Sequence, residues 1–437
     1  MSFGNVPKDL CVSSLASLRS TASKSTNGFF SADIRTVGSL LQYQRSPGVQ
    51  VTAASRTVPA TQLGNMYTLA SNSYSISLNQ NGSVLAVGLS AANLGDSVLS
   101  VFTSTAGFYT ETSIPLPGDV NIGGPPYFGT VSLNDAGDVL AFGITGDGDP
   151  AIGGDIGAVW LYVLIAGVWT LTGPKITGPG EIGQGLFGNS VSLNGAGNLL
   201  VVGCPFENGE LGAAYIFNIN NSLAPVFVQK LLGTVAGGQF GYFISLSADG
   251  STLAVSAPSF SNLIIGSVKI YTNIQGGNNQ QVVWTQQALF ENTFNFSAFG
   301  ANKISLSADG NILLVPVVTN ALIFYRTPGS VGQLAWSTGA LLPLPYDLVV
   351  NPAIALFFAI ISQDGNTIGA FNPRNNNNEG ASWIFTQGPL GTWTQNGPAL
   401  IGTGGTPNSI QGFFGSLSGD GKVVALVNSA SQLWVFV

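Results

Sequence analysis

Histidine is absent from this chain of 437 residues, and only 8% of its residues are charged. Without histidine the protein lacks the commonest general base, the commonest zinc ligand and the usual pH switch. The charged fraction lies far below the ~25% that is usual in soluble domains. So little charge is typical of a protein packed against others, and equally of an extracellular protein whose surface is rich in Asn, Ser and Thr.

Cysteine and long apolar runs are also scarce. Cys11 and Cys204 are far apart in sequence and form no metal-binding or redox motif, so two unrelated thiols are favoured over a disulfide. The most apolar stretch, 348–361, contains Asn351 and Pro352 and is too short to span a bilayer. The N-terminus has no basic start followed by an apolar run, so we expect no signal peptide.

The net charge of −7 is unevenly distributed along the chain. The first 56 residues hold six of the 13 basic residues and two of the 20 acidic residues, which gives this segment a net charge of about +4 and the rest about −11. Such asymmetry is typical of an arm that meets an oppositely charged surface, here the acidic body of a neighbouring copy. The body has no basic stripe, so we expect no nucleic acid partner.

A short phrase recurs seven times along the chain. Most copies read Ser-Leu, then a turn rich in Asn or Asp, then Gly, and the sixth copy, 360–365, is the weakest. The turn glycines lie 53–60 residues apart and are Gly82, Gly137, Gly197, Gly250, Gly310, Gly365 and Gly421. A period of this length with strand patterns and no helical pattern predicts a radial β-array. We therefore predict an all-β fold, a seven-bladed β-propeller with four-stranded blades.

Aromatic residues recur at fixed places in the predicted blades. The third strand of each unit ends in a triplet such as Trp160-Leu161-Tyr162 or Trp383-Ile384-Phe385. The fourth strand has an aromatic residue near its start, namely Tyr109, Trp169, Phe227, Trp284, Trp336 and Trp393. This regular recurrence favours packing between blades over a platform that stacks sugars or bases.

Only six fourth strands follow their third strands in the printed sequence. We expect residues 49–56 to supply the seventh, so that an N-terminal strand pairs with the C-terminal blade and closes the ring. This divides the chain into an N-terminal arm, residues 1–47, and a propeller, residues 48–437. The arm alone would be mostly disordered. We expect it to dock on a neighbouring subunit, and the alternative is that it packs along its own propeller.

The units resemble the FG-GAP repeats of integrin α-subunit propellers and of their bacterial and giant-virus relatives. The Phe-Gly signature stands at 128–129, 187–188, 240–241 and 299–300, is absent from units one and six, and is displaced to 414–415 in unit seven. The resemblance covers residues 49–437 and implies a propeller fold. It also implies a calcium site, because this family often holds calcium in a loop with several Asp at alternating positions.

Asp147, Asp149 and Asp155 in the second unit are the nearest match to such a calcium site. A hard cation needs several oxygen ligands that converge from a short loop. This loop follows the second strand instead of the first, and no other unit repeats its acid spacing. A solvated Asp-Gly turn is therefore favoured over a weak calcium site, and no other cofactor is predicted.

Glu207 and Glu210 share one loop and are a candidate carboxylate pair for glycoside cleavage. Nothing in the sequence raises the pKa of either carboxyl or places a partner beside it. We therefore expect an exposed loop with a surface role. The chain also has no nucleophile elbow and no phosphate-binding glycine loop, so we expect that it is not an enzyme.

The first functional hypothesis is a structural protein that self-associates through its N-terminal arm, as a subunit of a virion or surface fibre. Low charge, the basic arm and the absence of a secretion signal favour it, and they favour a location in the virion or at the cell surface. The alternative is a ligand-binding propeller of the lectin or adhesin type, with glycans or other virion or surface proteins as partners. A glycoside hydrolase is the third hypothesis.

Overall fold

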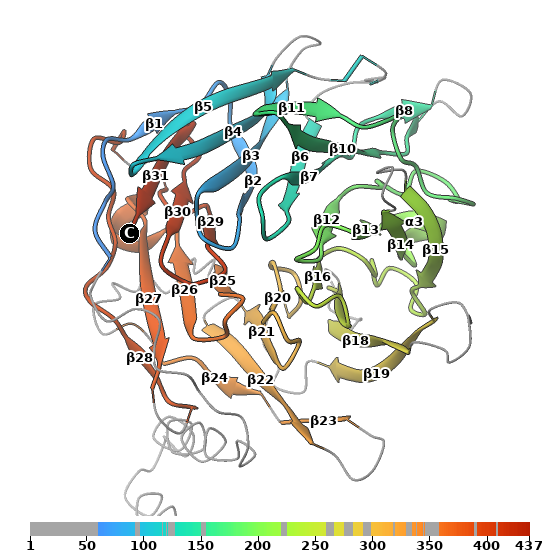
Figure 1. Ribbon diagram of the computed structural model, residues 1–437. Coiled ribbons are helices and arrows are strands. Elements are labelled where there is room, and N and C mark those ends of the chain that lie inside the picture. Colours follow the sequence, from blue (N-terminus) through green and yellow to red (C-terminus); the bar gives the residue numbers. More distant parts are fainter. Residues whose placement is uncertain are drawn as a thin grey trace, which may run out of the picture.

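Seven antiparallel blades of four strands form a closed ring in the computed structural model, as predicted (Figure 1). The structure describes residues 60–437 except for 92–96, 116, 119, 121–126, 150–153, 220–224, 259–265, 275–282, 292–298, 318–319, 329–333, 338, 344, 346–357, 389–390 and 408–409. The predicted arm, residues 1–47, and the predicted domain boundary lie outside the described residues.

The first and second strands of each blade lie toward the centre of the ring (Figure 1). The first strands are β2 (Ser73–Leu78), β6 (Tyr127–Leu133), β12 (Ser190–Leu193), β16 (Ile244–Leu246), β20 (Ser305–Leu306), β25 (Phe358–Ile361) and β29 (Phe414–Leu417). The second strands are β3 (Val84–Ala91), β7 (Val139–Ile144), β13 (Leu199–Cys204), β17 (Thr252–Ala257), β21 (Ile312–Val317), β26 (Thr367–Asn372) and β30 (Val424–Val427). The second strands are buried between neighbouring blades, which explains why they are apolar on both faces.

The third and fourth strands complete each blade toward the outside of the ring. The third strands are β4 (Ser97–Thr105), β10 (Ala158–Ile165), β14 (Ala213–Ile219), β18 (Ser267–Ile274), β22 (Asn320–Pro328), β27 (Ala381–Gln387) and β31 (Gln432–Phe436). The outer strands are β5 (Phe108–Pro115), β11 (Val168–Leu171), β15 (Pro225–Leu232), β19 (Val283–Glu291), β23 (Leu334–Trp336) with β24 (Ala340–Leu341), β28 (Trp393–Gln395) and β1 (Tyr67–Thr68). A short hairpin of β8 (Gly148–Asp149) and β9 (Gly154–Asp155) and the single turns α3 (Glu207–Glu210) and α4 (Asn375–Asn378) lie in loops.

The repeated phrase forms the turn between the first and second strands. All seven predicted turn glycines adopt the left-handed conformation, with φ between +64° and +73°, which glycine reaches without steric cost. Asn or Ser caps the turn: the Asn194 Oδ1 accepts hydrogen bonds from the amides of Asn198 and Leu199 at 3.0 Å. Where Ser replaces Asn, its hydroxyl donates a hydrogen bond to an Asp two residues later, as from Ser307 to Asp309 at 2.6 Å.

Backbone hydrogen bonds link these turns once around the ring. Each bond runs from an amide of one turn to a carbonyl oxygen of the next, and the circle closes where the Asp420 amide donates to the Gln80 carbonyl at 3.0 Å. The other donor and acceptor pairs are Gln80 to Asp135, Asp135 to Gly195, Gly195 to Ala248, Asp249 to Ala308, Ala308 to Gln363 and Asp364 to Gly419. Each blade therefore has a fixed register against its neighbours.

The serine of the repeated phrase forms a second set of bonds between blades. At six joints its hydroxyl oxygen accepts a hydrogen bond of 3.0–3.1 Å from the next blade. The donor is the backbone amide of the Leu or Ile in that blade's copy of the phrase, as where the Leu133 amide donates to Ser77. The sixth unit carries Ile360 in place of Ser, and it therefore cannot accept this bond from blade 7. The Ser-Leu pair recurs because it joins neighbouring blades.

The Phe-Gly signature also has a packing role. Phe187 and Phe240 are buried between blades, and the glycines that follow them have φ of +91° and +93°. A Cβ atom on Gly241 would collide with the carbonyl oxygen of Ala213 in the preceding blade. Only glycine fits this position, because both the space and the backbone conformation exclude a side chain.

The aromatic triplets pack between blades, as predicted. Trp160, Trp383 and Trp434 are among the largest fully buried side chains. Each belongs to a hydrophobic cluster built from two neighbouring blades. The core of the molecule is therefore a circle of interfaces between blades.

An N-terminal strand closes the ring, as predicted, but its predicted position was wrong. Strand β1 pairs with β31, and the Thr61 and Val437 backbones exchange two hydrogen bonds of 2.9 Å. The closing segment is therefore 61–68, and the expected segment 49–56 lies outside the described residues. The prediction of 49–56 used the strand pattern of the sequence alone. The segment that pairs with β31 is 61–68, whose strand pattern is interrupted by Gly64.

Candidate functional site

The three candidate calcium ligands lie in one loop of blade 2. Asp147 is fully buried, and its Oδ2 lies 2.5 Å from the Nζ of Lys175. Asp149 and Asp155 lie in β8 and β9, where the backbones of the two strands pair. Within the part of the chain that the structure describes, no group of three or more His, Cys, Asp or Glu side chains is placed to hold a metal ion. The calcium site stays a prediction, but Asp147 is not the solvated residue that the sequence suggested.

Asp147, Glu207 and Asn375 occupy the same place in three blades. Each is buried just after the second strand, and its carbonyl oxygen accepts a bond of 2.9–3.1 Å from the glycine that precedes the third strand, Gly157, Gly212 or Gly380. The two acids meet a lysine from their own blade, Lys175 or Lys230. The two buried carboxylates are therefore parts of a recurring loop, and each has a lysine that balances its charge.

The expectation that Glu207 has an exposed surface role was wrong. Glu207 is fully buried. Its carboxylate pairs with Lys230 and accepts a hydrogen bond from the Tyr215 hydroxyl at 2.7 Å. Asn208 and Glu210, which follow Glu207 in the same turn, have positive φ values of 50° and 65°. Glu210 is exposed and accepts a hydrogen bond from Gln239 at 3.1 Å. The two carboxyls therefore have different environments, and Figure 1 shows α3 away from the centre of the ring.

A second glutamate, Glu181, lies near this ion pair. Its Oε1 accepts hydrogen bonds from the Gly185 amide at 3.1 Å and from the Cys204 thiol at 3.4 Å, and its Oε2 is buried with no hydrogen-bond partner among the residues that the structure describes. Burial raises the pKa of Glu181 to about 7, and the charge of Glu207 adds to this rise. Burial also raises the pKa of the Cys204 thiol, so the free thiol stays protonated and unreactive. The candidate disulfide partner, Cys11, lies outside the described residues.

Apolar side chains gather on the outer strands of blades 1 to 4. Phe108 is 72% exposed and Val168 is 65% exposed. Soluble proteins usually have polar residues at such exposed positions of an outer strand. The large hydrophobic residues that are exposed on these four strands are Phe108, Val168, Leu171, Val226, Phe227, Leu232, Val283 and Leu289. We call this surface the apolar rim. Among described residues, the outer strands of blades 5 to 7 expose no large hydrophobic side chain.

The apolar rim follows about half of the ring. Figure 1 shows β5, β11, β15 and β19 on the outside of successive blades. Their charged residues are Glu111, Lys230 and Glu291, and Lys230 is paired with Glu207.

No described helix has both the length and the apolar character needed to cross a bilayer.

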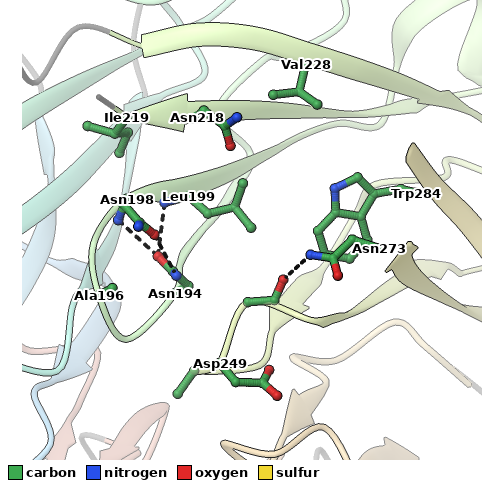
Figure 2. Close-up of a pocket in the computed structure, with 12 residues that line it drawn as sticks. Asn194, Ala196, Asn198, Leu199, Asn218, Ile219, Val228, Asp249, Asn273 and Trp284 are labelled. Atoms are coloured by element: carbon green, nitrogen blue, oxygen red, sulfur yellow. Dashed lines mark hydrogen bonds between the residues drawn. The ribbon is translucent and has the colours of Figure 1, made fainter. Parts of the chain in front are cut away.

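A pocket of about 550 Å³ lies between blades 3 and 4 (Figure 2). Two turns of the repeated phrase form one side, and the ends of β14 and β18 with the outer strands β15 and β19 form the other. Its lining contains amide side chains, the exposed carboxylate of Asp249, three large aliphatic residues, two alanines and Trp284. Asn194 is held by its bonds to the turn backbone, and the Asn273 amide donates to the Gly250 carbonyl at 2.7 Å.

Sequence reasoning treated Trp284 only as a packing residue and did not identify this pocket. Trp284 does pack between blades, and it is 3% exposed. The signal lay in a comparison of blades: blade 5 has Tyr325 at the place where blade 3 has Asn218. The apolar rim was also detectable in part, because β15 carries more apolar residues than alternation with one face in solvent predicts.

Comparisons with known proteins give this chain no family. No family model matches it, and no curated protein matches its sequence. Among solved structures, the chain is similar to a protein from Lactobacillus plantarum, with 14% identity and a TM-score of 0.49, over 76% of this chain and 87% of that chain.

Proposed function

We propose that this chain is a non-enzymatic assembly protein whose propeller associates with a second copy through the apolar rim. The observation that supports it is the uneven exposure of large hydrophobic side chains: eight of the 13 that are exposed in the described part of the chain lie on the outer strands of blades 1 to 4. Exposed apolar patches of this kind mark interaction sites, because their burial is favourable by about 25 cal/mol per Å². Depletion of charge at the same place is typical of interface cores.

A second copy fits this surface better than a charged partner does. Among the described residues, Glu111 and Glu291 are the only charges on the four strands without an ion-pair partner, so two rims can meet with little electrostatic repulsion. Pairing through side chains is favoured over pairing of strand edges, since bulges distort β14–β15 and β18–β19. An isologous contact would bury the same residues on both copies.

We further propose that the propeller is of the FG-GAP type, since Phe187-Gly188 and Phe240-Gly241 serve the same packing role between blades. A subunit of a virion or surface fibre is the setting that such a protein suits. The basic N-terminal segment would strengthen the assembly, because its charge is opposite to that of the acidic propeller.

The test is the mass of the protein in solution, measured by light scattering over a concentration series. The native chain should exceed the 45.0 kDa of one copy as concentration rises. The double variant Val168→Lys and Val226→Lys should stay monomeric, because it places charges in the middle of the rim. Thr394→Lys, a matched change on the exposed outer strand of blade 6, should assemble as the native protein does. Equal assembly of both variants would refute the role of the rim.

A further inference from the structure

We propose that the pocket between blades 3 and 4 binds a neutral saccharide through Trp284 and the surrounding amide side chains. This site is separate from the assembly function proposed above. The joint between blades 5 and 6 is equivalent to this one and has no such space beside its tryptophan.

The strand register shows which residues are equivalent at the two joints. Asn218 and Tyr325 each pair with the first residue of the second strand of their blade, Leu199 and Ile312. Trp284 and Trp393 lie at the same place on the outer strand of the following blade, where they pair with Asn273 and Gln387. The two joints thus differ beside the indole, where a much smaller asparagine replaces the tyrosine and Asn273 stands in place of Gln387.

At the joint between blades 5 and 6, the protein fills this space itself. The Tyr325 side chain is buried, and its hydroxyl oxygen accepts hydrogen bonds from the Trp393 Nε1 at 2.7 Å and from the Gln387 amide at 3.3 Å. A six-membered ring with one hydroxyl group therefore satisfies the buried indole. The same space between blades 3 and 4 is part of the pocket.

At the joint between blades 3 and 4, the indole has no such partner. The Trp284 Nε1 is buried and makes no hydrogen bond to the described residues, and an unsatisfied buried donor is unfavourable. Figure 2 shows the nitrogen edge of the ring turned toward Val228 and Asn218. Asn218 is exposed, so its side chain rotates freely. A ligand hydroxyl that enters beside Asn218 would accept a hydrogen bond from the Trp284 Nε1, as the Tyr325 hydroxyl does from the Trp393 Nε1.

The rest of the lining selects the class of ligand. The pocket is larger than a phenol ring needs, and Asn198, Asn218 and Asn273 offer donors and acceptors that suit several hydroxyl groups. No Lys or Arg lines it, and the carboxylate of Asp249 repels anions. Leu199 and Ile219 provide an apolar wall for the carbon face of a ring. These features fit a neutral sugar.

The pocket is fixed in shape by bonds on both of its sides. The Gly195 amide donates to the Ala248 carbonyl at 2.9 Å, which joins the two turns. On the other side, the Gln229 side chain exchanges two bonds with the Trp284 backbone, at 2.8 and 3.2 Å. A preformed pocket loses little conformational entropy when a ligand binds.

The experiment uses the full chain, a glycan array, and titration of tryptophan fluorescence with glucose, galactose, mannose, fucose and N-acetylglucosamine. We expect binding by at least one saccharide and a loss of about tenfold or more in affinity in Asn218→Tyr, which copies the residue of blade 5. The variant should be at least as heat-stable as the native protein, which shows that it folds. Thr103→Tyr, the same change at the equivalent exposed position of blade 1, should leave binding unchanged.

Three results would overturn the proposal. One is the absence of binding to every saccharide on the array and in the titrations. Another is binding that Asn218→Tyr leaves unchanged, which would place the sugar elsewhere on the molecule. The third is binding of N-acetyltyrosinamide without any saccharide, which would identify the pocket as a site for a tyrosine side chain of a partner protein.

Discussion

Replacement of Glu181 by Gln should remove a pH dependence from the stability of this protein. Burial raises the pKa of the carboxyl from 4.5 to about 7, and the charge of Glu207 adds to the rise, while the bonds from Cys204 and Gly185 and the charge of Lys230 oppose it. In the unfolded chain the carboxyl has its ordinary pKa. Between these two values the folded state binds more protons than the unfolded state, so this group lowers stability as pH rises through the window.

The size of the effect follows from the change in proton affinity. A tenfold change is worth about 1.4 kcal/mol, so a rise of the pKa from 4.5 to about 7 corresponds to about 3–4 kcal/mol. Glu181 is only partly buried, and screening by water reduces this to about 1–2 kcal/mol. Glutamine keeps the oxygen that accepts from Gly185 and Cys204 and carries no charge at any pH.

The measurement is urea unfolding of both proteins, followed by tryptophan fluorescence, from about pH 4.5 to about pH 8. The difference in unfolding free energy, variant minus native, should increase by about 1–2 kcal/mol across this range. The other acidic groups cancel in the difference, because both proteins contain them. A difference that stays constant, or that decreases as pH rises, would refute the reasoning.

Three further changes test the parts of the fold that hold the candidate sites. Gly241→Ala should lower the free energy of urea unfolding by more than about 3 kcal/mol, because φ is positive and the new Cβ would collide with the backbone of Ala213. Gly167→Ala, at a similar φ in open space, should lower it by only about 1 kcal/mol. Lys230→Met should lower the thermal midpoint strongly, because it leaves the buried charge of Glu207 unpaired at a cost of about 3–5 kcal/mol, and a second change of Glu207 to Gln should restore most of the loss. Ser192→Ala should lose about 1 kcal/mol, since it removes one bond between blades, and an unchanged urea midpoint would contradict that role.

The ring could be predicted from the sequence because its turns have specific chemical requirements. Each repeat needs a glycine at positive φ and a Ser or Asn that caps the turn, and both leave a clear pattern at a fixed period. The closing strand left no such pattern. Residues 61–68 pair with the edge of β31 that blade 7 leaves free, and their own strand propensity is weak.

The candidate sites were harder to predict because they depend on contacts between distant residues. The sequence around Glu207 has the composition of an exposed turn, and only the folded loop shows that Lys230 and Tyr215 surround its carboxylate. The pocket beside Trp284 arises from a side chain that is smaller than its equivalent in another blade. Neither feature has a signature in local composition.

The central claim, that the propeller assembles through the apolar rim, is tested most directly by the mass of the native protein in solution. Light scattering over a concentration series should give a mass that rises above 45.0 kDa and returns to that value when Val168 and Val226 are replaced by Lys. A native protein that stays at 45.0 kDa at every concentration would contradict the claim.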